Sequence, residues 1–93
     1  MIMHMAIHHP EPGKAGDLVE ALRQHEQQIR TQPGVLSVHT LKDAHSGAVV
    51  ALAVYATKES WLAAQPGLAR LESGEEFSGW ESAPPTIYHL EEI

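Results

Sequence analysis

Cysteine is absent from this chain of 93 residues. Its absence excludes a disulfide framework, a cysteine-ligated zinc or iron–sulfur site and a thiol nucleophile. Basic residues are also few, with six Lys and Arg against twelve Asp and Glu, which gives a formal net charge of −6. A nucleic-acid-binding protein needs a basic surface, so this balance argues against a nucleic-acid partner.

Long apolar runs are missing as well. The longest run, Ala48–Ala56, has nine residues, about half of what a membrane-spanning helix needs. The apolar start at Met1–Ile7 lacks the basic flank and the small-residue cleavage site of a signal peptide. We therefore expect one cytoplasmic domain over residues 1–93, without a membrane partner and small enough to gain stability from a second subunit.

The acidic charge is concentrated near the C-terminal end. Residues 1–71 carry six acids and all six bases, whereas residues 72–93 carry six acids and no base. The region 72–85 is rich in Glu, Ser, Gly and Pro, which is typical of a long loop. The acidic segment 72–93 is interpreted as a solvated surface, or alternatively as one that shapes a site or discourages wrong partners.

Hydrophobic spacing predicts six elements in the order β-α-β-β-α-β. Strands are expected at 2–8, 35–41, 48–55 and 86–92, and helices at 14–31 and 58–64. The first helix carries an apolar stripe at steps of three and four residues, namely Leu18, Leu22, His25 and Ile29. Pro66-Gly67 is expected to break the second helix, with at most a further turn at 68–71, and Pro84-Pro85 is expected to precede the last strand.

This order predicts an α+β, ferredoxin-like fold, in which a four-stranded antiparallel sheet has both helices on one face. The other sheet face would be bare, yet Met3, Met5 and Ile7 make one side of the first strand apolar. Strand 48–55 is apolar on both sides. We therefore expect a homodimer that packs sheet against sheet, because a second copy could cover this face.

Three short motifs mark the junctions between these elements: Pro12-Gly13-Lys14, Pro33-Gly34 and Ala56–Trp61. With these motifs in this order, residues 2–66 resemble the antibiotic biosynthesis monooxygenase family, a branch of the dimeric α/β-barrel proteins. The resemblance implies a pocket between the helices and the sheet. Some relatives oxidise phenols or quinols with O₂ and no metal or flavin, some degrade heme, and many have no assigned activity.

The resemblance thus implies a small cofactor-independent monooxygenase that acts on an aromatic or quinol-type small molecule. An alternative is a non-catalytic ligand-binding or interaction dimer of the same fold, which the absence of a His from 65–71 favours. Heme degradation is disfavoured, because the family's axial-ligand position falls near Arg70 or Leu71 and its strand amide position near Ala6. Only a Trp is retained, at Trp61.

His25 is the candidate catalytic base, because an imidazole on the apolar stripe can take a proton at neutral pH. The alternative is a histidine at the edge of the core. Candidate substrate-binding residues are Trp61, Tyr55, Trp80, His4 and Arg70. Each has a structural alternative, which is packing for the aromatic residues, packing at a strand end or exposure to solvent for His4, and an ion pair with the acidic segment for Arg70.

Histidines on the strands form a second candidate group. His4 and His8 share one strand face, where His39 or His89 could join them by pairing across the sheet. Such a cluster can bind a transition metal. With seven histidines in the chain, this spacing arises easily by chance, so we expect no metal and no cofactor.

Overall fold

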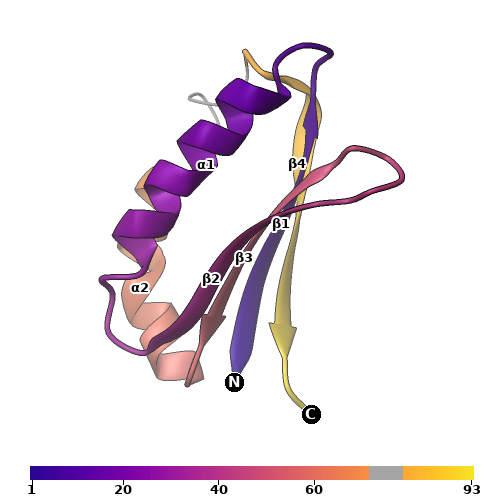
Figure 1. Cartoon of the computed structure of the whole chain (residues 1–93). Coiled ribbons are helices and arrows are strands. Elements are labelled where there is room, and N and C mark those ends of the chain that lie inside the picture. Colours follow the sequence, from indigo (N-terminus) through magenta and orange to yellow (C-terminus); the bar gives the residue numbers. More distant parts are fainter. Residues whose placement is uncertain (72–78) are drawn as a thin grey trace.

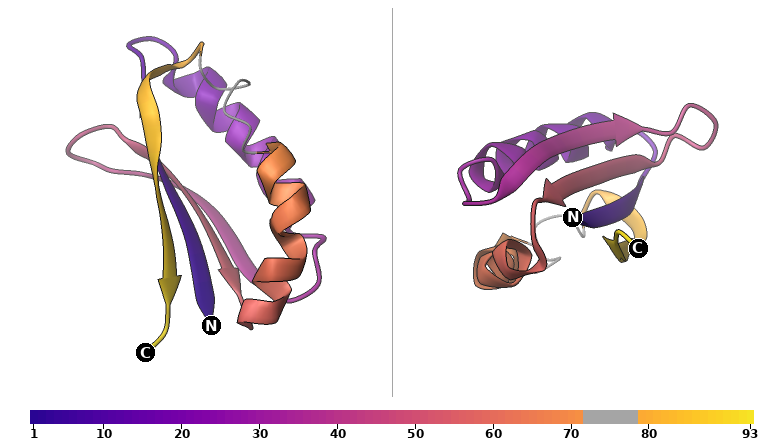
Figure 2. Two further views of the ribbon diagram at one scale, coloured as in Figure 1. Left: turned by 180° about the vertical axis from the view of Figure 1, so that it is seen from behind. Right: turned by 90° about the horizontal axis from the view of Figure 1, so that it is seen from below.

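The computed structural model describes residues 1–71 and 79–93, and of residues 65–71 it describes the backbone alone. Its elements are β1 (Ile2–Pro10), α1 (Ala15–Ile29), β2 (Val35–Lys42), β3 (Val49–Tyr55), α2 (Lys58–Leu71) and β4 (Glu81–Glu91). The strands form an antiparallel sheet in the order β2-β3-β1-β4, and both helices lie on one side of it (Figure 1 and Figure 2). The predicted ferredoxin-like fold is confirmed.

Short polar and glycine-containing connections join these elements where the sequence predicts them. In the turn between β2 and β3, the Asp43 carboxylate accepts a hydrogen bond from the backbone N–H of Ser46 at 3.1 Å, and Gly47 has a φ of +77°. At the start of α2, the Thr57 hydroxyl accepts from the N–H of Ser60 at 3.1 Å. This contact is the predicted N-cap, which satisfies one of the unpaired amides of the first turn.

The second helix is longer than predicted. Pro66-Gly67 was expected to end it, but α2 continues to Leu71, so that expectation is wrong. A proline removes a backbone hydrogen bond from a helix, yet its fixed φ near −65° is itself a helical value. The loss is therefore limited to this one hydrogen bond, and α2 continues through Pro66 without a break.

The last strand begins earlier than predicted. β4 starts at Glu81 rather than at residue 86, and Pro84 and Pro85 lie within it. β4 is an edge strand that pairs with β1, and a proline is tolerated where its missing N–H would face solvent or a bulge. The register between β1 and β4 shifts between Ile7 and His9, which is where the two prolines lie. This shift brings Glu81 into the sheet.

The two faces of the sheet differ in cover. Along β1, Ile2, His4, Ala6 and His8 are buried beneath the helices, and the alternate residues are half-buried on the other face. That outer face is formed by side chains opposite one another in the register, namely Met3, Met5, Ile7, Val50, Leu52, Val54, Leu41, Tyr88 and Leu90, with His39 and Thr86 among them. Tyr88 and Leu90 are 48% and 41% exposed. The outer face is therefore mostly apolar and partly exposed.

Candidate functional site

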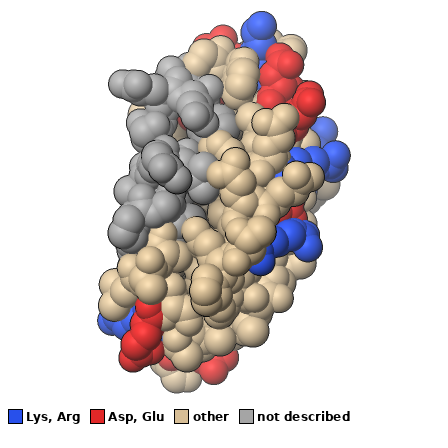
Figure 3. Space-filling model, turned by 90° about the vertical axis from the view of Figure 1, so that its left-hand side faces the viewer, with Lys and Arg blue, Asp and Glu red and all other residues tan. Residues whose placement is uncertain are grey.

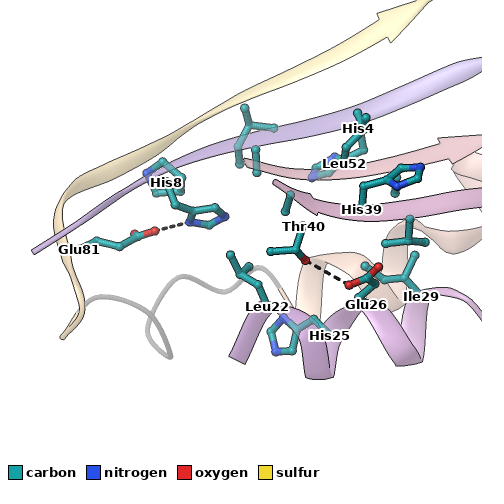
Figure 4. Close-up of a pocket in the computed structure, with 16 residues that line it drawn as sticks. His4, His8, Leu22, His25, Glu26, Ile29, His39, Thr40, Leu52 and Glu81 are labelled. Atoms are coloured by element: carbon teal, nitrogen blue, oxygen red, sulfur yellow. Dashed lines mark hydrogen bonds and ion pairs between the residues drawn. The ribbon is translucent and has the colours of Figure 1, made fainter. Parts of the chain in front are cut away.

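A cavity of about 70 Å³ lies between α1 and the helix-facing side of the sheet (Figure 4). A cavity of roughly 10–15 Å³ is enough to hold a water molecule, so this is usable internal space. Its apolar walls include Ala6, Leu22, Ile29, Val38, Ala51 and Ala53. Its polar side chains are imidazoles, carboxylates and a hydroxyl, contributed by His4, His8, His25, Glu26, Glu81 and Thr40.

At one end of the cavity, His8 from β1 meets Glu81 from β4. The Nδ1 atom of His8 is hydrogen-bonded to Oε1 of Glu81, and each side chain is only 5% exposed. A buried carboxylate is costly unless it is paired and hydrogen-bonded. The pair therefore links the edge strand to the wall of the cavity through a contact that needs both partners.

A second pair of side chains, formed by two histidines, lies on the same face of β1 and β4. The Nδ1 atom of His4 lies 3.0 Å from Nε2 of His89, so one ring donates to the other. His4 is buried, and the Trp61 ring from α2 packs against His89 with 4.9 Å between ring centroids. This contact fixes the position of His4 in the cavity wall.

Glu26 from α1 connects the helix to β2 across the cavity. Its carboxylate accepts from Arg30 Nη2 at 2.7 Å and from the Thr40 hydroxyl at 3.1 Å. The hydrogen bond from Arg30 is the main cause of a lowered pKa at Glu26, and the bond from Thr40 adds to it against the opposing effect of burial. Glu26 is therefore an ionised group at the cavity wall at neutral pH.

His4 and His25, two of the sequence-predicted site residues, line the cavity, but two of the aromatic candidates are placed in the core. Tyr55 is fully buried and its hydroxyl donates to Gln32 Oε1 at 3.1 Å. Trp61 packs against the core cluster that contains Tyr55.

Trp80 and Arg70 complete the predicted set. Trp80 packs against a second core cluster that is formed by Leu18, Leu22 and Val49, which is the structural docking that the sequence left open. The side chain of Arg70 lies outside the described residues. Lys58 forms an ion pair with Glu91 of the acidic segment, at 2.8 Å. This contact raises the pKa of Lys58 and lowers the pKa of Glu91.

The contact between His8 and Glu81 was not predicted from the sequence. His4 and His8 were placed on one face by alternation, but Glu81 was assigned to the loop before the last strand. The position of Glu81 beside β1 follows only from the register of β4. Because Pro84 and Pro85 are typical of a loop, the sequence did not indicate that the strand begins before them. Among residues 1–71 and 79–93, no group of three or more His, Asp and Glu side chains is arranged to hold a metal ion.

The helix-bearing side of the molecule has mixed charge. Figure 3 shows that the described Lys and Arg side chains on this side have Asp and Glu side chains among them, around an uncharged centre. Within the described part of the chain, neither helix has the length and apolar character that crossing a membrane requires.

A family model described as antibiotic biosynthesis monooxygenase matches residues 1–67. No curated protein matches the sequence. Among solved structures, the chain is similar to Rv0793 from Mycobacterium tuberculosis, with a TM-score of 0.83 at 16% identity over 99% of this chain and 94% of that one.

Two further solved structures have the same fold. A candidate antibiotic biosynthesis monooxygenase from Nitrosomonas europaea aligns with a TM-score of 0.82 at 18% identity, over 100% of this chain and 99% of that one. A monooxygenase from the gene ActVA-Orf6 of Streptomyces coelicolor, in complex with the ligand Nanaomycin D, aligns with a TM-score of 0.75 at 22% identity, over 99% and 87%. At these identities the likeness is one of fold.

Proposed function

Because the chain belongs to the antibiotic biosynthesis monooxygenase family, we propose that it is a small monooxygenase-like enzyme that oxidises an aromatic or quinol-type molecule with O₂ and no cofactor. The observation that carries the proposal is the cavity between α1 and the sheet, where apolar walls surround imidazole and carboxylate groups. A structure of similar fold holds the ligand Nanaomycin D, which supports a role in binding a small ligand here.

The chemistry needs a base and a dry site rather than a bound cofactor, because the substrate supplies the electrons. An anthrone-type substrate loses a proton from its CH₂ group to the base, for which His25 is the candidate, and the resulting carbanion reduces O₂. One oxygen atom becomes the ring carbonyl and the other leaves as water, so that CH₂ and O₂ give C=O and H₂O. The apolar walls exclude bulk water, which strengthens the electrostatic interactions inside the site.

The working unit in this proposal is a homodimer joined through the outer face of the sheet. That face carries Met5, Tyr88 and Leu90, and the latter two are more than two-fifths exposed in a single chain. Contiguous apolar surface of this kind marks an interaction site in soluble proteins. A second copy offers the same face, so the contact closes with two-fold symmetry.

The second candidate is a non-catalytic dimer that binds a ligand in the same cavity. It is favoured by residues 65–71, which contain no His where the family's helix has one. Both candidates predict binding of an aromatic probe, but only the enzyme consumes O₂. A heme titration distinguishes heme degradation from both candidates, because only a protein with a heme site would shift the Soret band.

The deciding experiment measures O₂ uptake with a panel of anthrones, naphthohydroquinones and dihydroxynaphthalenes. We expect uptake above the autoxidation rate for at least one of them, with formation of the corresponding carbonyl product. His25→Gln should reduce the rate, whereas His45→Gln, at an exposed turn position, should leave it unchanged. Uptake at the autoxidation rate for the whole panel would remove the enzyme proposal and leave the binding dimer.

A further inference from the structure

We propose that Glu26 selects the ligand of the cavity, because its carboxylate accepts a hydrogen bond from the hydroxyl of a phenol or hydroquinone and disfavours quinones and anions. The inference rests on the proposed function and deepens it, since it names a specificity-determining residue and the oxidation state of the ligand that binds. Glu26 would contact a hydroxyl group of the ligand, whereas His25 would remove a carbon-bound proton.

The Glu26 carboxylate is held in place through both of its oxygens. Oε1 accepts from Arg30 Nη2 at 2.7 Å, and Oε2 accepts from the Thr40 hydroxyl at 3.1 Å. The same Arg30 nitrogen donates to the backbone carbonyl of Val38 at 3.1 Å, so α1 and β2 fix the group together. Figure 4 shows Glu26 extending from α1 toward the sheet, with its carboxylate beside Thr40. An acceptor held in this way is already in position when a ligand enters.

The carboxylate can accept more hydrogen bonds than the described residues give it. A carboxylate has about four lone-pair sites, and Arg30 and Thr40 each occupy one of them. The Glu26 side chain is only 15% exposed and forms part of the cavity wall. A hydroxyl donor in the cavity can therefore bind to this carboxylate without displacing Arg30 or Thr40.

The difference between a donor and an acceptor determines which oxidation state binds. A hydroquinone carries two hydroxyl donors, whereas the corresponding quinone carries only carbonyl acceptors. The hydrogen bond from Arg30 lowers the pKa of Glu26, so the carboxyl is ionised at neutral pH and has no proton to donate to a carbonyl. A site that accepts a hydrogen bond from a ligand hydroxyl rejects the analogue that lacks it. The cavity should therefore bind the reduced form of a ligand more tightly than the oxidised form.

The charges of the cavity walls also disfavour ionic ligands. The described walls contain the carboxylates of Glu26 and Glu81 and neither Lys nor Arg, which are the residues that usually bind a carboxylate or phosphate. An ammonium ligand would have to leave water for mostly apolar walls, which is costly, and Glu26 is already paired with Arg30. A neutral hydroxyl donor is therefore the ligand that these walls favour.

The first test compares 1,4-naphthohydroquinone with 1,4-naphthoquinone by isothermal titration calorimetry, without oxygen so that neither probe is converted. We expect the unmodified protein to bind the hydroquinone about tenfold more tightly, which is the usual effect of one hydrogen bond to a charged group. Glu26→Gln should abolish this preference, because an amide both donates and accepts. Glu20→Gln, at an exposed carboxylate on the same helix, should retain it. Equal affinity of the unmodified protein for both probes, or no binding of either, would overturn the proposal.

The readout is the ratio of two dissociation constants measured on the same variant. A loss of folded protein in Glu26→Gln affects both constants equally, so it cancels in the ratio. If Glu26 only linked α1 to β2, Glu26→Gln would weaken both probes alike and leave the ratio unchanged, and that result would exclude the role in selection.

The second test uses three naphthalenes that do not interconvert. The unmodified protein should bind 1-naphthol more tightly than 1-methoxynaphthalene, which lacks the donor, and 1-naphthoate most weakly, because its charge repels the carboxylates. Glu26→Gln should narrow both differences. Binding of 1-naphthoate as tightly as 1-naphthol by the unmodified protein would overturn the selection by charge.

Failure of the selection by Glu26 and failure of the proposed function give different results. If both tests agree with the selection while O₂ uptake stays at the autoxidation rate, the selection stands and the oxidation is excluded. If O₂ is consumed while the ratio of the dissociation constants is the same in Glu26→Gln and in the unmodified protein, the oxidation stands and the selection is excluded.

Discussion

Replacing Gly34 by Ala should destabilise the protein through two separate effects. Gly34 has a φ of +82°, a left-handed conformation that costs a residue with a Cβ about 1–2 kcal/mol. The new Cβ would also lie 2.4 Å from both Cβ and Oγ of Ser60, where carbon atoms prefer a separation of about 3.5–4.0 Å. Overpacking of this kind costs about 1–3 kcal/mol more.

The net loss in the free energy of unfolding follows from these terms. Ala restricts the unfolded chain more than Gly does, and this effect alone would stabilise the folded state by about 0.4–1 kcal/mol. The expected destabilisation is then about 1–5 kcal/mol, a large part of the roughly 5–15 kcal/mol that is typical of a small domain. The effect is concentrated where two connections meet, because the carbonyl of Gly34 accepts from the N–H of Ala56 at 2.8 Å.

Gly13→Ala is the matched control for this prediction. Gly13 has nearly the same φ, +81°, but within the described part of the chain, its two chain neighbours aside, no heavy atom lies within 4 Å of an added Cβ. Urea unfolding followed by circular dichroism should give a larger drop in midpoint for Gly34→Ala than for Gly13→Ala, at a similar m value. Adding Ser60→Gly to Gly34→Ala should recover the difference. Equal midpoints for the two single variants would refute the argument from the Ser60 contact.

Three further predictions concern the outer face, the cavity and the helix–strand link. Met5→Lys, at the centre of the outer face, should reduce the light-scattering mass from that of a dimer to about the 10.2 kDa of one chain; a dimer with unchanged affinity would locate the interface elsewhere. Ala6→Leu should fill the cavity and weaken binding of an aromatic probe measured by calorimetry, whereas Ala63→Leu, exposed on α2, should not. Glu26→Gln should lower the stability measured at neutral pH. Because the folded pKa of Glu26 lies below its usual 4.5, its charged form stabilises the fold above that value. The difference between Glu26→Gln and the unmodified protein should therefore shrink as the pH falls through the folded pKa; a difference independent of pH would contradict the link to Arg30.

The fold was predictable from local signals in the sequence. Glycines at the turns, the Thr57 cap and the two apolar periodicities each act over a few residues, so one sequence is enough to identify them. The errors arose where contacts with the rest of the fold determine where a helix ends or a strand begins. Pro66 was expected to end the helix, although a helix can continue beyond a single lost hydrogen bond. Pro84-Pro85 was expected to precede the last strand, although an edge strand tolerates proline.

The candidate site was less predictable, because its contacts join distant positions. His25 and His4 were identified from periodicity alone, and both line the cavity. Glu81 lies 73 positions from His8, and the pair forms only after β4 takes its place beside β1. Tyr55 was predicted to bind substrate, but its ring is in the core. Periodicity indicates which face a side chain occupies, but it does not indicate what lies opposite.

The position of β4 at the edge of the sheet affects how this site can diversify. The family match covers residues 1–67, which carry α1 and the first three strands, and β4 follows it. An edge strand has one neighbour, so substitutions along β4 disturb the rest of the sheet less than substitutions in a central strand would. Glu81, Pro85 and Ile87 nevertheless line the cavity. One wall of the cavity can therefore acquire new side chains, and the protein new ligands, while the shared body of the fold stays the same.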